Sequence, residues 1–392
     1  MLFTIHYSPL TLLYRIRVIL HLSLSLVITL AIEESSLYLQ SKPKSICMKS
    51  HLAIVIILGC VLAACRKDNS IKPSADTMKE DYLVCADDSW VAEQNYPSYY
   101  GNIFFIYNNK LYVPDAEEAD PFNQKLHVFD GTTWTEKETH TPFSACVSFF
   151  TIGSKGYAIA WGGLTGTCWF YEYNILTNNW TRKADFPGIG RNGVCSFTLN
   201  GKGYVVGGSY EQGELNGVWQ PGGYTAETWE YNPATNTWTQ RHNLPLKRAY
   251  AQGLSIGNKG YVVNGKYPDD LGFLRGLVEY DPTTDRWTSK SLMPGQGRIR
   301  PAAFVIDGVI YAGGGQDPDY DPMTDFYRYN LSTDTWTRMA DIPAVRYDKG
   351  VFSLNGKGYI AYRGTTFPAP SGMKKYNPKY CVNINTPGQL SN

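Results

Sequence analysis

Apolar and polar positions alternate in short stretches from about residue 82 to residue 380 of this 392-residue chain. Alternation with a period of two predicts β-strands, because successive side chains of a strand point to opposite faces. Four stretches follow one another in a fixed order: an apolar strand, a second apolar strand after a Gly turn, an alternating strand, and a strand that carries Trp. The pattern therefore predicts an all-β chain with four antiparallel strands in each repeating unit.

Two aromatic residues mark every unit. A Trp followed by Pro seven or eight positions later ends each unit, at intervals of 44 to 58 residues; these are Trp90, Trp134, Trp180, Trp238, Trp287 and Trp336. A Tyr in the second strand forms the other series: Tyr112, Tyr157, Tyr204, Tyr261, Tyr311 and Tyr359. Four short strands with a period near 50 residues are typical of a β-propeller, with one blade per unit.

The units resemble kelch repeats. The resemblance rests on GKGYVVGG (Gly201–Gly208), on IYAGGG (Ile310–Gly315) and on EYNPATNTW (Glu230–Trp238), and it covers residues 82–380. The Gly pair is replaced by Asn264-Gly265 in the fourth unit and by Arg363-Gly364 in the sixth, and the first unit lacks it. A kelch propeller implies that the first strand of each blade lines a central channel and that the Trp strand is outermost.

The first Trp stands without inner strands in front of it, and the last unit lacks a Trp strand. After Trp336 only three strand segments remain, VFSLNG, KGYIAY and MKKYNP, and the position that aligns with a Trp is Asn383. We therefore predict a six-bladed propeller, closed by an N-terminal outer strand in which Trp90 lies beside Met373–Pro378. Cys85 precedes this strand and Cys381 follows its expected partner, so we also predict a disulfide between the two ends.

The N-terminal region predicts a targeting segment followed by a linker. Residues 48–64 read as a signal peptide, and its end, LAAC, resembles the lipobox of bacterial lipoproteins, which implies a lipid on Cys65. Residues 65–81 are then a flexible tether, 82–380 the propeller and 381–392 a C-terminal tail, while 1–47 are an extension upstream of the true start. The alternatives are an ordinary secretory signal with a chance Cys, and a membrane anchor at Val18–Ile32. The expected location is the bacterial cell envelope, on either face of the outer membrane.

Charge and composition restrict the function. A net charge of +1 gives no general attraction for nucleic acid, so no nucleic acid is expected as partner. No zinc-type spacing of Cys or His occurs, and no cofactor or metal is predicted. The acidic loop with Asp317, Asp319, Asp321 and Asp325 resembles a calcium loop only loosely, because it lacks the required Gly and Glu.

One register carries the candidate binding residues. Thirteen positions before each repeat Tyr, at the start of the channel-lining strand, stand Tyr99, Ser144, Arg191, Arg248, Arg298 and Arg346. Guanidinium groups around one mouth of the channel would bind a carboxylate, a phosphate or an acidic peptide. Alternatively, as the kelch resemblance implies, each Arg pairs with a carboxylate or carbonyl of a neighbouring blade. The long loop of the third unit adds Glu211, Glu214 and Trp219, and Trp219 is either a stacking platform for a sugar or packed on a neighbouring blade.

Three functional classes follow. The first is an envelope binding module for a carbohydrate, an acidic small molecule or a protein partner. The second is a sugar-acid mutarotase, because six-bladed kelch proteins include the sialic-acid mutarotase; Glu211 or Glu214 would then be acid or base. The third, a copper oxidase resembling galactose oxidase, is disfavoured, because residues 65–392 contain only His127, His140 and His242 and no Tyr-His pair. Whether the protein is an enzyme stays open.

Overall fold

The described structure is a computed structural model, and all of its elements are strands. It covers residues 83–85, 88–93, 104–114, 125–143, 146–161, 168–215, 218–268, 272–343, 350–363, 371–378, 381–383 and 390–391. The chain divides into two compact units, 1–80 and 81–392, and every described residue belongs to the second. Nowhere in the described ranges is there a helix long and apolar enough to cross a membrane. The predicted upstream extension, signal peptide, lipidated Cys65 and the whole tether lie outside the described residues.

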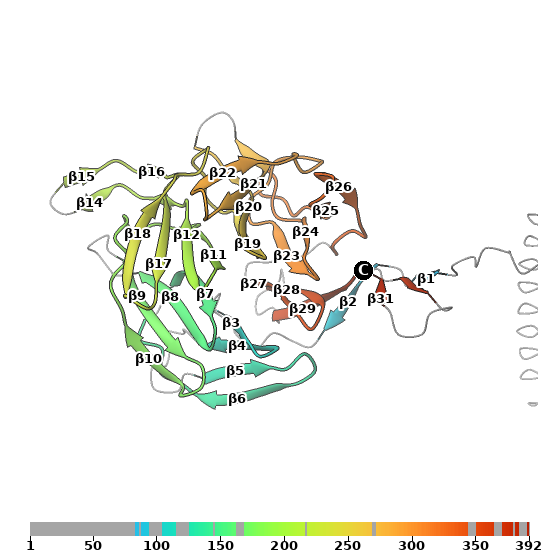
Figure 1. Ribbon diagram of the computed structural model, residues 1–392, viewed down its shortest axis with the longest axis horizontal. Coiled ribbons are helices and arrows are strands. Elements are labelled where there is room, and N and C mark those ends of the chain that lie inside the picture. The colour runs from blue at the N-terminus through green and yellow to red at the C-terminus, as the bar shows by residue number, and fades with distance from the viewer. Residues whose placement is uncertain are drawn as a thin grey trace, which may run out of the picture. The chain divides into compact units, whose positions relative to one another are not determined.

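Six four-stranded antiparallel sheets surround a common centre (Figure 1), as the repeat count predicts. Blade 1 contains β3 (Phe105–Tyr107), β4 (Lys110–Pro114), β5 (Lys125–Phe129) and β6 (Trp134–Glu138). Blade 2 contains β7 (Cys146–Ile152), β8 (Lys155–Trp161), β9 (Cys168–Asn174) and β10 (Asn179–Arg182). Blade 3 contains β11 (Cys195–Leu199), β12 (Lys202–Val206), β17 (Thr228–Asn232) and β18 (Thr237–Arg241).

Blades 4 to 6 repeat this order. Blade 4 contains β19 (Gln252–Ile256), β20 (Lys259–Lys266), β21 (Phe273–Asp281) and β22 (Arg286–Ser289). Blade 5 contains β23 (Ala302–Ile306), β24 (Val309–Gly313), β25 (Phe326–Asn330) and β26 (Thr335–Arg338). Blade 6 contains β27 (Gly350–Leu354), β28 (Lys357–Arg363) and β29 (Ser371–Asn377), and its outer strand is β2 (Ser89–Glu93). The long loop of blade 3 forms two hairpins, β13 (Ser209–Tyr210) with β16 (Gly223–Tyr224) and β14 (Gly213–Leu215) with β15 (Val218–Gln220).

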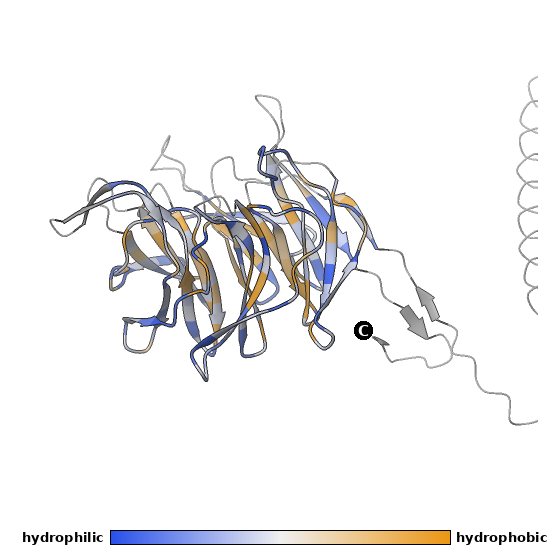
Figure 2. Ribbon diagram, turned by 90° about the horizontal axis from the view of Figure 1, so that it is seen from above, coloured by the Kyte–Doolittle hydropathy of each residue, from blue (hydrophilic) through white to orange (hydrophobic). Residues whose placement is uncertain are grey.

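Apolar side chains form one cluster at each of the six blade–blade interfaces, and Figure 2 shows apolar segments within every blade. One contact recurs in four of these six clusters: an inner-strand Phe packs on the Gly that precedes the repeat Tyr of the next blade. A Cβ on Gly203 would lie 2.1 Å from the ring of Phe150, and one on Gly260 would lie 2.4 Å from the ring of Phe197. Each such Gly is therefore required by the close approach of neighbouring sheets.

The predicted closure is confirmed. Strand β2 pairs with β29 in antiparallel register, with Trp90 opposite Tyr376 and Glu93 opposite Met373. The indole Nε1 of Trp90 donates a hydrogen bond to Ala340 O at 3.2 Å, and its ring contacts Phe326 of blade 5 at 5.2 Å between centroids. The N-terminal strand thus supplies both the last ladder of blade 6 and a contact to blade 5.

The same indole bond recurs in blades 3, 4 and 5. The outer-strand Trp of each of these blades donates to a carbonyl in the segment that leaves the preceding blade, at 2.9 or 3.0 Å: Trp238 to Ala184 O, Trp287 to His242 O and Trp336 to Ser291 O. The residue two positions before the Trp accepts from the backbone N–H of the same target: Asn236 from Ala184, Asp285 from His242 and Asp334 from Ser291. Asp88 accepts from Ala340 N in the same way, so β2 reproduces both bonds of an ordinary outer strand.

The two ends of the propeller region also pair with each other. Strand β1 (Leu83–Cys85) pairs with β30 (Cys381–Asn383), which in turn pairs with β31 (Leu390–Ser391). The backbone register places Cys85 directly opposite Cys381. The side chains of both lie outside the described residues, so the disulfide stays a prediction, and the expected tail of residues 381–392 contributes two short strands.

Replacing Trp90 tests the closure. We expect Trp90→Ala to lower the free energy of unfolding by about 3–5 kcal/mol, because it removes a packed indole and its bond to Ala340. Val91→Ala on the same strand is the control, since Val91 is 38% exposed, and it should cost about 0.5 kcal/mol. Urea unfolding followed by fluorescence measures both. An equal effect of the two substitutions would show that β2 does not hold the ring closed.

Candidate functional site

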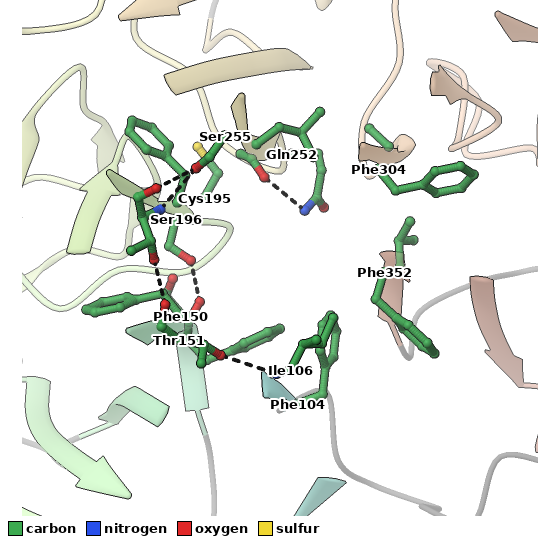
Figure 3. A pocket seen from close by; sticks show the side chains of 18 of the residues that line it. Phe104, Ile106, Phe150, Thr151, Cys195, Ser196, Gln252, Ser255, Phe304 and Phe352 are labelled. Atoms are coloured by element: carbon green, nitrogen blue, oxygen red, sulfur yellow. Dashed lines mark hydrogen bonds between the residues drawn. The ribbon is translucent and has the colours of Figure 1, made fainter. Parts of the chain in front are cut away.

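The inner strands of all six blades line a central cavity of about 390 Å³ (Figure 3). Its described lining residues include no Asp, Glu, Lys, Arg or His. The one thiol, Cys195, is buried, and burial raises its pKa to about 12. Phe104 and Phe149 meet edge to face at 4.6 Å and form an aromatic wall on the side of blades 1 and 2. The cavity therefore offers apolar surface and hydroxyl groups, without a charged acid or base.

The hydroxyl groups of the channel join neighbouring blades. Thr198 Oγ1 donates to Thr151 O at 3.0 Å, and Ser255 Oγ donates to Thr198 O at 2.8 Å. The hydroxyl of Thr151 accepts from Ile106 N at 3.3 Å. These bonds link blades 1 to 4 through the channel wall (Figure 3). Much of the polarity of the channel is thus used in holding the ring together.

The three described arginines of the predicted column are buried. Arg191, Arg248 and Arg298 are 2%, 3% and 0% exposed. Each donates Nη1 to the carbonyl oxygen sixteen residues further on, at the end of the second strand: Gly207 O at 3.3 Å, Asn264 O at 3.2 Å and Gly314 O at 3.2 Å. Each Arg therefore ties the segment before the inner strand to the end of the strand beside it. These bonds stay within one blade and do not reach the neighbouring blade that the structural alternative named.

Two of these arginines also bind a carboxylate of their own blade. Arg191 Nη2 lies 2.6 Å from Glu227 Oε2, and Arg298 contacts both oxygens of Asp325 at 2.7 Å. Burial acts to raise the pKa of Glu227, but the charge of Arg191 and hydrogen bonds from Trp229 and Arg191 hold it below its ordinary value. The guanidinium groups of Arg191 and Arg298 are thus engaged inside the blades.

The remaining predicted site residues are only partly described. Tyr99, Ser144 and Arg346 lie outside the described residues. Glu214 and Trp219 are opposite each other in the β14–β15 hairpin, but their side chains lie outside the described part, whereas Glu211 is exposed. A role of Trp219 as a sugar platform stays a prediction.

The acidic loop of blade 5 uses its carboxylates internally. Asp317 Oδ1 accepts from the backbone N–H of Asp319 at 3.0 Å and of Asp321 at 2.9 Å, and Asp325 is bound by Arg298. Among the described residues no group of three or more His, Cys, Asp or Glu side chains is arranged to hold a metal ion.

Two positions after the buried Arg248 and Arg298 stand a half-buried Tyr250 and an exposed Arg300, near the channel mouth. Tyr250 and Arg300 both have left-handed backbone conformations, with φ of 57° and 49°. The Arg300 guanidinium lies over the Tyr250 ring, 5.1 Å from its centroid. Arg300 N donates to Tyr250 O, and Tyr250 N donates to Gly193 O, both at 2.7 Å. A left-handed conformation costs a bulky residue about 1–2 kcal/mol, and such strain concentrates at functional sites.

Three further side chains complete this group. Lys266 Nζ lies 3.3 Å from the Tyr320 hydroxyl and 5.6 Å from the centroid of the Phe273 ring. Tyr320 is 50% exposed, and its hydrogen bond raises the pKa of Lys266 above the ordinary value.

Backbone contacts hold these loops against the pair above. Lys266 forms a β-bridge with Ala249, and the side-chain amide of Gln316, itself bridged to Ile299, donates to Tyr320 O at 3.0 Å. We call Tyr250, Lys266, Phe273, Arg300 and Tyr320 the mouth cluster. Tyr250 directly precedes Ala251, which lines the cavity.

A comparison with protein families finds a Kelch motif at residues 297–343. This segment runs from the loop that carries Arg298 and Arg300 through all of blade 5, and five further blades repeat its four strands. The protein is a six-bladed β-propeller with a Kelch motif in its fifth blade. It shares 36% identity over 118 residues with N-acetylneuraminate epimerase of Pasteurella multocida (strain Pm70), which is 29% of each chain.

Other relatives match comparable portions. The kelch propeller is 33% identical over 101 residues to N-acetylneuraminate epimerase of Haemophilus influenzae (strain PittEE), covering 24% of this chain and 25% of that protein. Beta-scruin of Limulus polyphemus is 28% identical over 117 residues, 30% of this chain and 12% of its own length. The solved structure of YjhT covers 64% of this chain and 97% of its own, with 15% identity and a TM-score of 0.47. The matches to these epimerases span under a third of their length.

The buried Arg298 and the exposed Arg300 should differ in how much their replacement changes the stability of the protein. We expect Arg298→Ala to lower the free energy of unfolding by about 3–5 kcal/mol, because it leaves Asp325 without its buried partner. Arg300→Gly should leave the free energy of unfolding unchanged or raise it by about 1 kcal/mol, because the substitution removes an exposed side chain and relieves the strain of the left-handed backbone. Chemical denaturation of the two variants measures this. A loss of several kcal/mol in Arg300→Gly would assign Arg300 a structural role instead.

Proposed function

We propose that this kelch propeller is a binding module of the bacterial cell envelope that takes an acidic carbohydrate, or an acidic group of a peptide or protein partner, at the mouth cluster. The observation that carries the proposal is the exposed Arg300 guanidinium on the Tyr250 ring, kept in place at the cost of backbone strain. The buried Arg191 and Arg298 support this mouth from below by fixing the loops, while Arg346, Tyr99, Ser144 and Trp219 are further candidates around it.

The chemistry of the cluster suits a ligand with both a flat apolar face and a negative group. Lys266 and Arg300 provide two cations, and a charge-assisted hydrogen bond from either contributes about 1.5–3 kcal/mol. Tyr250 and Tyr320 provide rings on which the apolar face of a sugar can stack. The net charge of +1 gives little general attraction, so recognition has to come from this local arrangement.

A second candidate function is a sugar-acid mutarotase. It is supported by the similarity to N-acetylneuraminate epimerases, which spans 29% of the chain. Ring opening of a sugar needs an acid or base within reach of the substrate, and the described channel residues supply no carboxylate or imidazole. The exposed Glu211, together with Glu214, would have to provide it from the long loop of blade 3.

Binding of N-acetylneuraminate tests the proposed site. We expect Arg300→Gly to weaken binding by about tenfold to a hundredfold, the equivalent of one lost charge-assisted contact. The matched control is Arg338→Ala, because Arg338 also stacks on a tyrosine, with its Cζ 5.3 Å from the centroid of Tyr327. It lies in the outer strand of blade 5, and its loss should leave affinity unchanged. Titration calorimetry measures the affinities.

The same sugar separates the two functions. Proton NMR of freshly dissolved N-acetylneuraminate follows the exchange of its anomers with and without protein. Accelerated exchange that disappears in Glu211→Gln, Glu214→Gln or the double variant would establish the mutarotase, whereas binding without acceleration would establish the binding module. Binding that survives Arg300→Gly combined with Lys266→Ala would refute the mouth cluster as the site.

The location is tested at the N-terminus of the natural protein. We expect mass spectrometry to find a mature chain that begins at Cys65 and carries diacylglycerol, because LAAC precedes a polar tether. A Cys65→Ser variant should then be lost from the membrane fraction. A peptide from residues 33–47 in the natural protein would contradict the assignment of Met48 as the start.

A further inference from the structure

In the part of the chain that the structure describes, Arg248 of the fourth blade contacts no carboxylate, unlike its two described counterparts. In blades 3 and 5 the carboxylate that binds the Arg belongs to the residue directly before the third strand. This residue is Glu227 in blade 3 and Asp325 in blade 5. The corresponding residue of blade 4 is Gly276. Arg248 is therefore a buried arginine for which the blade supplies no carboxylate at this position.

Backbone bonds fix this correspondence. The segment that leaves each blade donates one hydrogen bond to the third strand, at 2.8 or 2.9 Å: Leu244 N to Ala226 O, Met293 N to Arg275 O, and Ile342 N to Thr324 O. The next residue along the third strand is Glu227, Gly276 or Asp325 respectively. The glycine thus occupies the same place in its blade as the two acids do in theirs.

The loop before Arg248 is also one residue shorter. Blades 3 and 5 have PGIGR and PGQGR, and the Arg Nε donates to a loop carbonyl, Ile189 O at 2.9 Å or Gln296 O at 3.3 Å. Blade 4 has PLKR, and in the described part of the chain Arg248 Nε is buried without a hydrogen-bond partner. Burial lowers the pKa of Arg248 to about 10. An isolated buried cation is costly, so the charge of Arg248 is poised for an external anion.

The space beside Gly276, where a carboxylate side chain stands in blades 3 and 5, is almost free of other side chains of the described residues. Among the described residues, and apart from the chain neighbours of Gly276, the only atom within 4 Å of a Cβ built on this glycine is Leu292 Cδ2, at 4.0 Å, and Leu292 is 55% exposed. Blade 6 also has a glycine here, Gly372, but the Tyr362 hydroxyl lies 2.6 Å from its Cβ position and closes it. Between these two blades, only blade 4 combines the glycine with free space.

We infer that the opening at Gly276 is a binding site for a carboxylate, which takes the place beside Arg248 that Glu227 and Asp325 take in the neighbouring blades. Those two acids serve as templates for the bound group, with nitrogen–oxygen distances of 2.6 and 2.7 Å. The ligand is a carboxylate on a narrow stem, either a free small acid or an acidic side chain of a protein partner. The site is separate from the mouth cluster and does not depend on the function proposed for it.

Thermal unfolding in acetate tests this site. At equal ionic strength, sodium acetate should raise the Tm of the wild type by about 2–4 °C more than sodium chloride does. Gly276→Glu, which supplies the acid from the chain, should raise the Tm by a similar amount without acetate and abolish the acetate effect. Gly276→Gln has the same shape without charge; it should abolish the acetate effect but give no rise of its own.

Two further arms give the experiment its specificity. In an Arg300→Gly background, the part of the acetate effect that Gly276→Gln removes should be unchanged, which separates this site from the mouth cluster. N-acetylglutamate α-amide in place of acetate represents a protein side chain, and a larger Tm shift with it would identify a protein partner as the source of the carboxylate. An equal acetate effect in the wild type and Gly276→Glu, no acetate effect at all, or a lower Tm in Gly276→Glu would each overturn the inference.

Discussion

Neighbouring blades are held together by a contact in which a large ring lies directly on a backbone without a side chain. The ring of Phe150 covers Gly203, that of Phe197 covers Gly260 and that of Phe304 covers Gly358, so each glycine is fixed by the blade before it. Where the fourth and fifth blades meet, the pair is Leu254 and Ile310, two side chains of intermediate size in one cluster. The interface thus keeps its volume while the residues change, as expected for a closely packed interior. The outer strands then add a second, polar connection through the Trp and the Asx residue before it.

Most of this architecture could be predicted from the sequence because it is repeated. Six copies of the Tyr and Trp positions define strands, order and blade number, and the surplus Trp90 could be paired with the one blade that lacked an outer strand. The glycine that carries the interface was harder to recognise. The repeat pattern is most noticeable at the Gly pair after the second strand. The closest approach to an aromatic ring, however, occurs at the single Gly before the Tyr, as at Gly203.

The candidate site was only partly predictable. The Arg register could be counted, but whether a guanidinium faces solvent depends on Glu227 and Asp325, which are separated from it by loops of different length. Tyr250 and Arg300 share one repeat position, two residues after the buried arginines, and Gly193 at the same position of blade 3 is left-handed too, with φ of 62°. The backbone turn therefore recurs, but the residue type differs from blade to blade, so the stacking of Arg300 on Tyr250 could not be predicted from the repeat. The proposed function thus rests on residues that differ between blades, in loops held by a regular frame.

Closure by β2 also decides how the molecule responds to force. Tension on the chain before Leu83 acts first on the short ladder between β1 and β30, and then on β2, the strand that closes the propeller and pairs with β29 over five residues in antiparallel register. The strand can leave the ring only if its ladder to β29 and the Trp90 and Asp88 contacts to Ala340 are broken. If the protein is attached to a surface by its N-terminus, mechanical load therefore acts on β2. The strength of the contacts that hold β2 would then set the force at which blade 6 loses its outer strand.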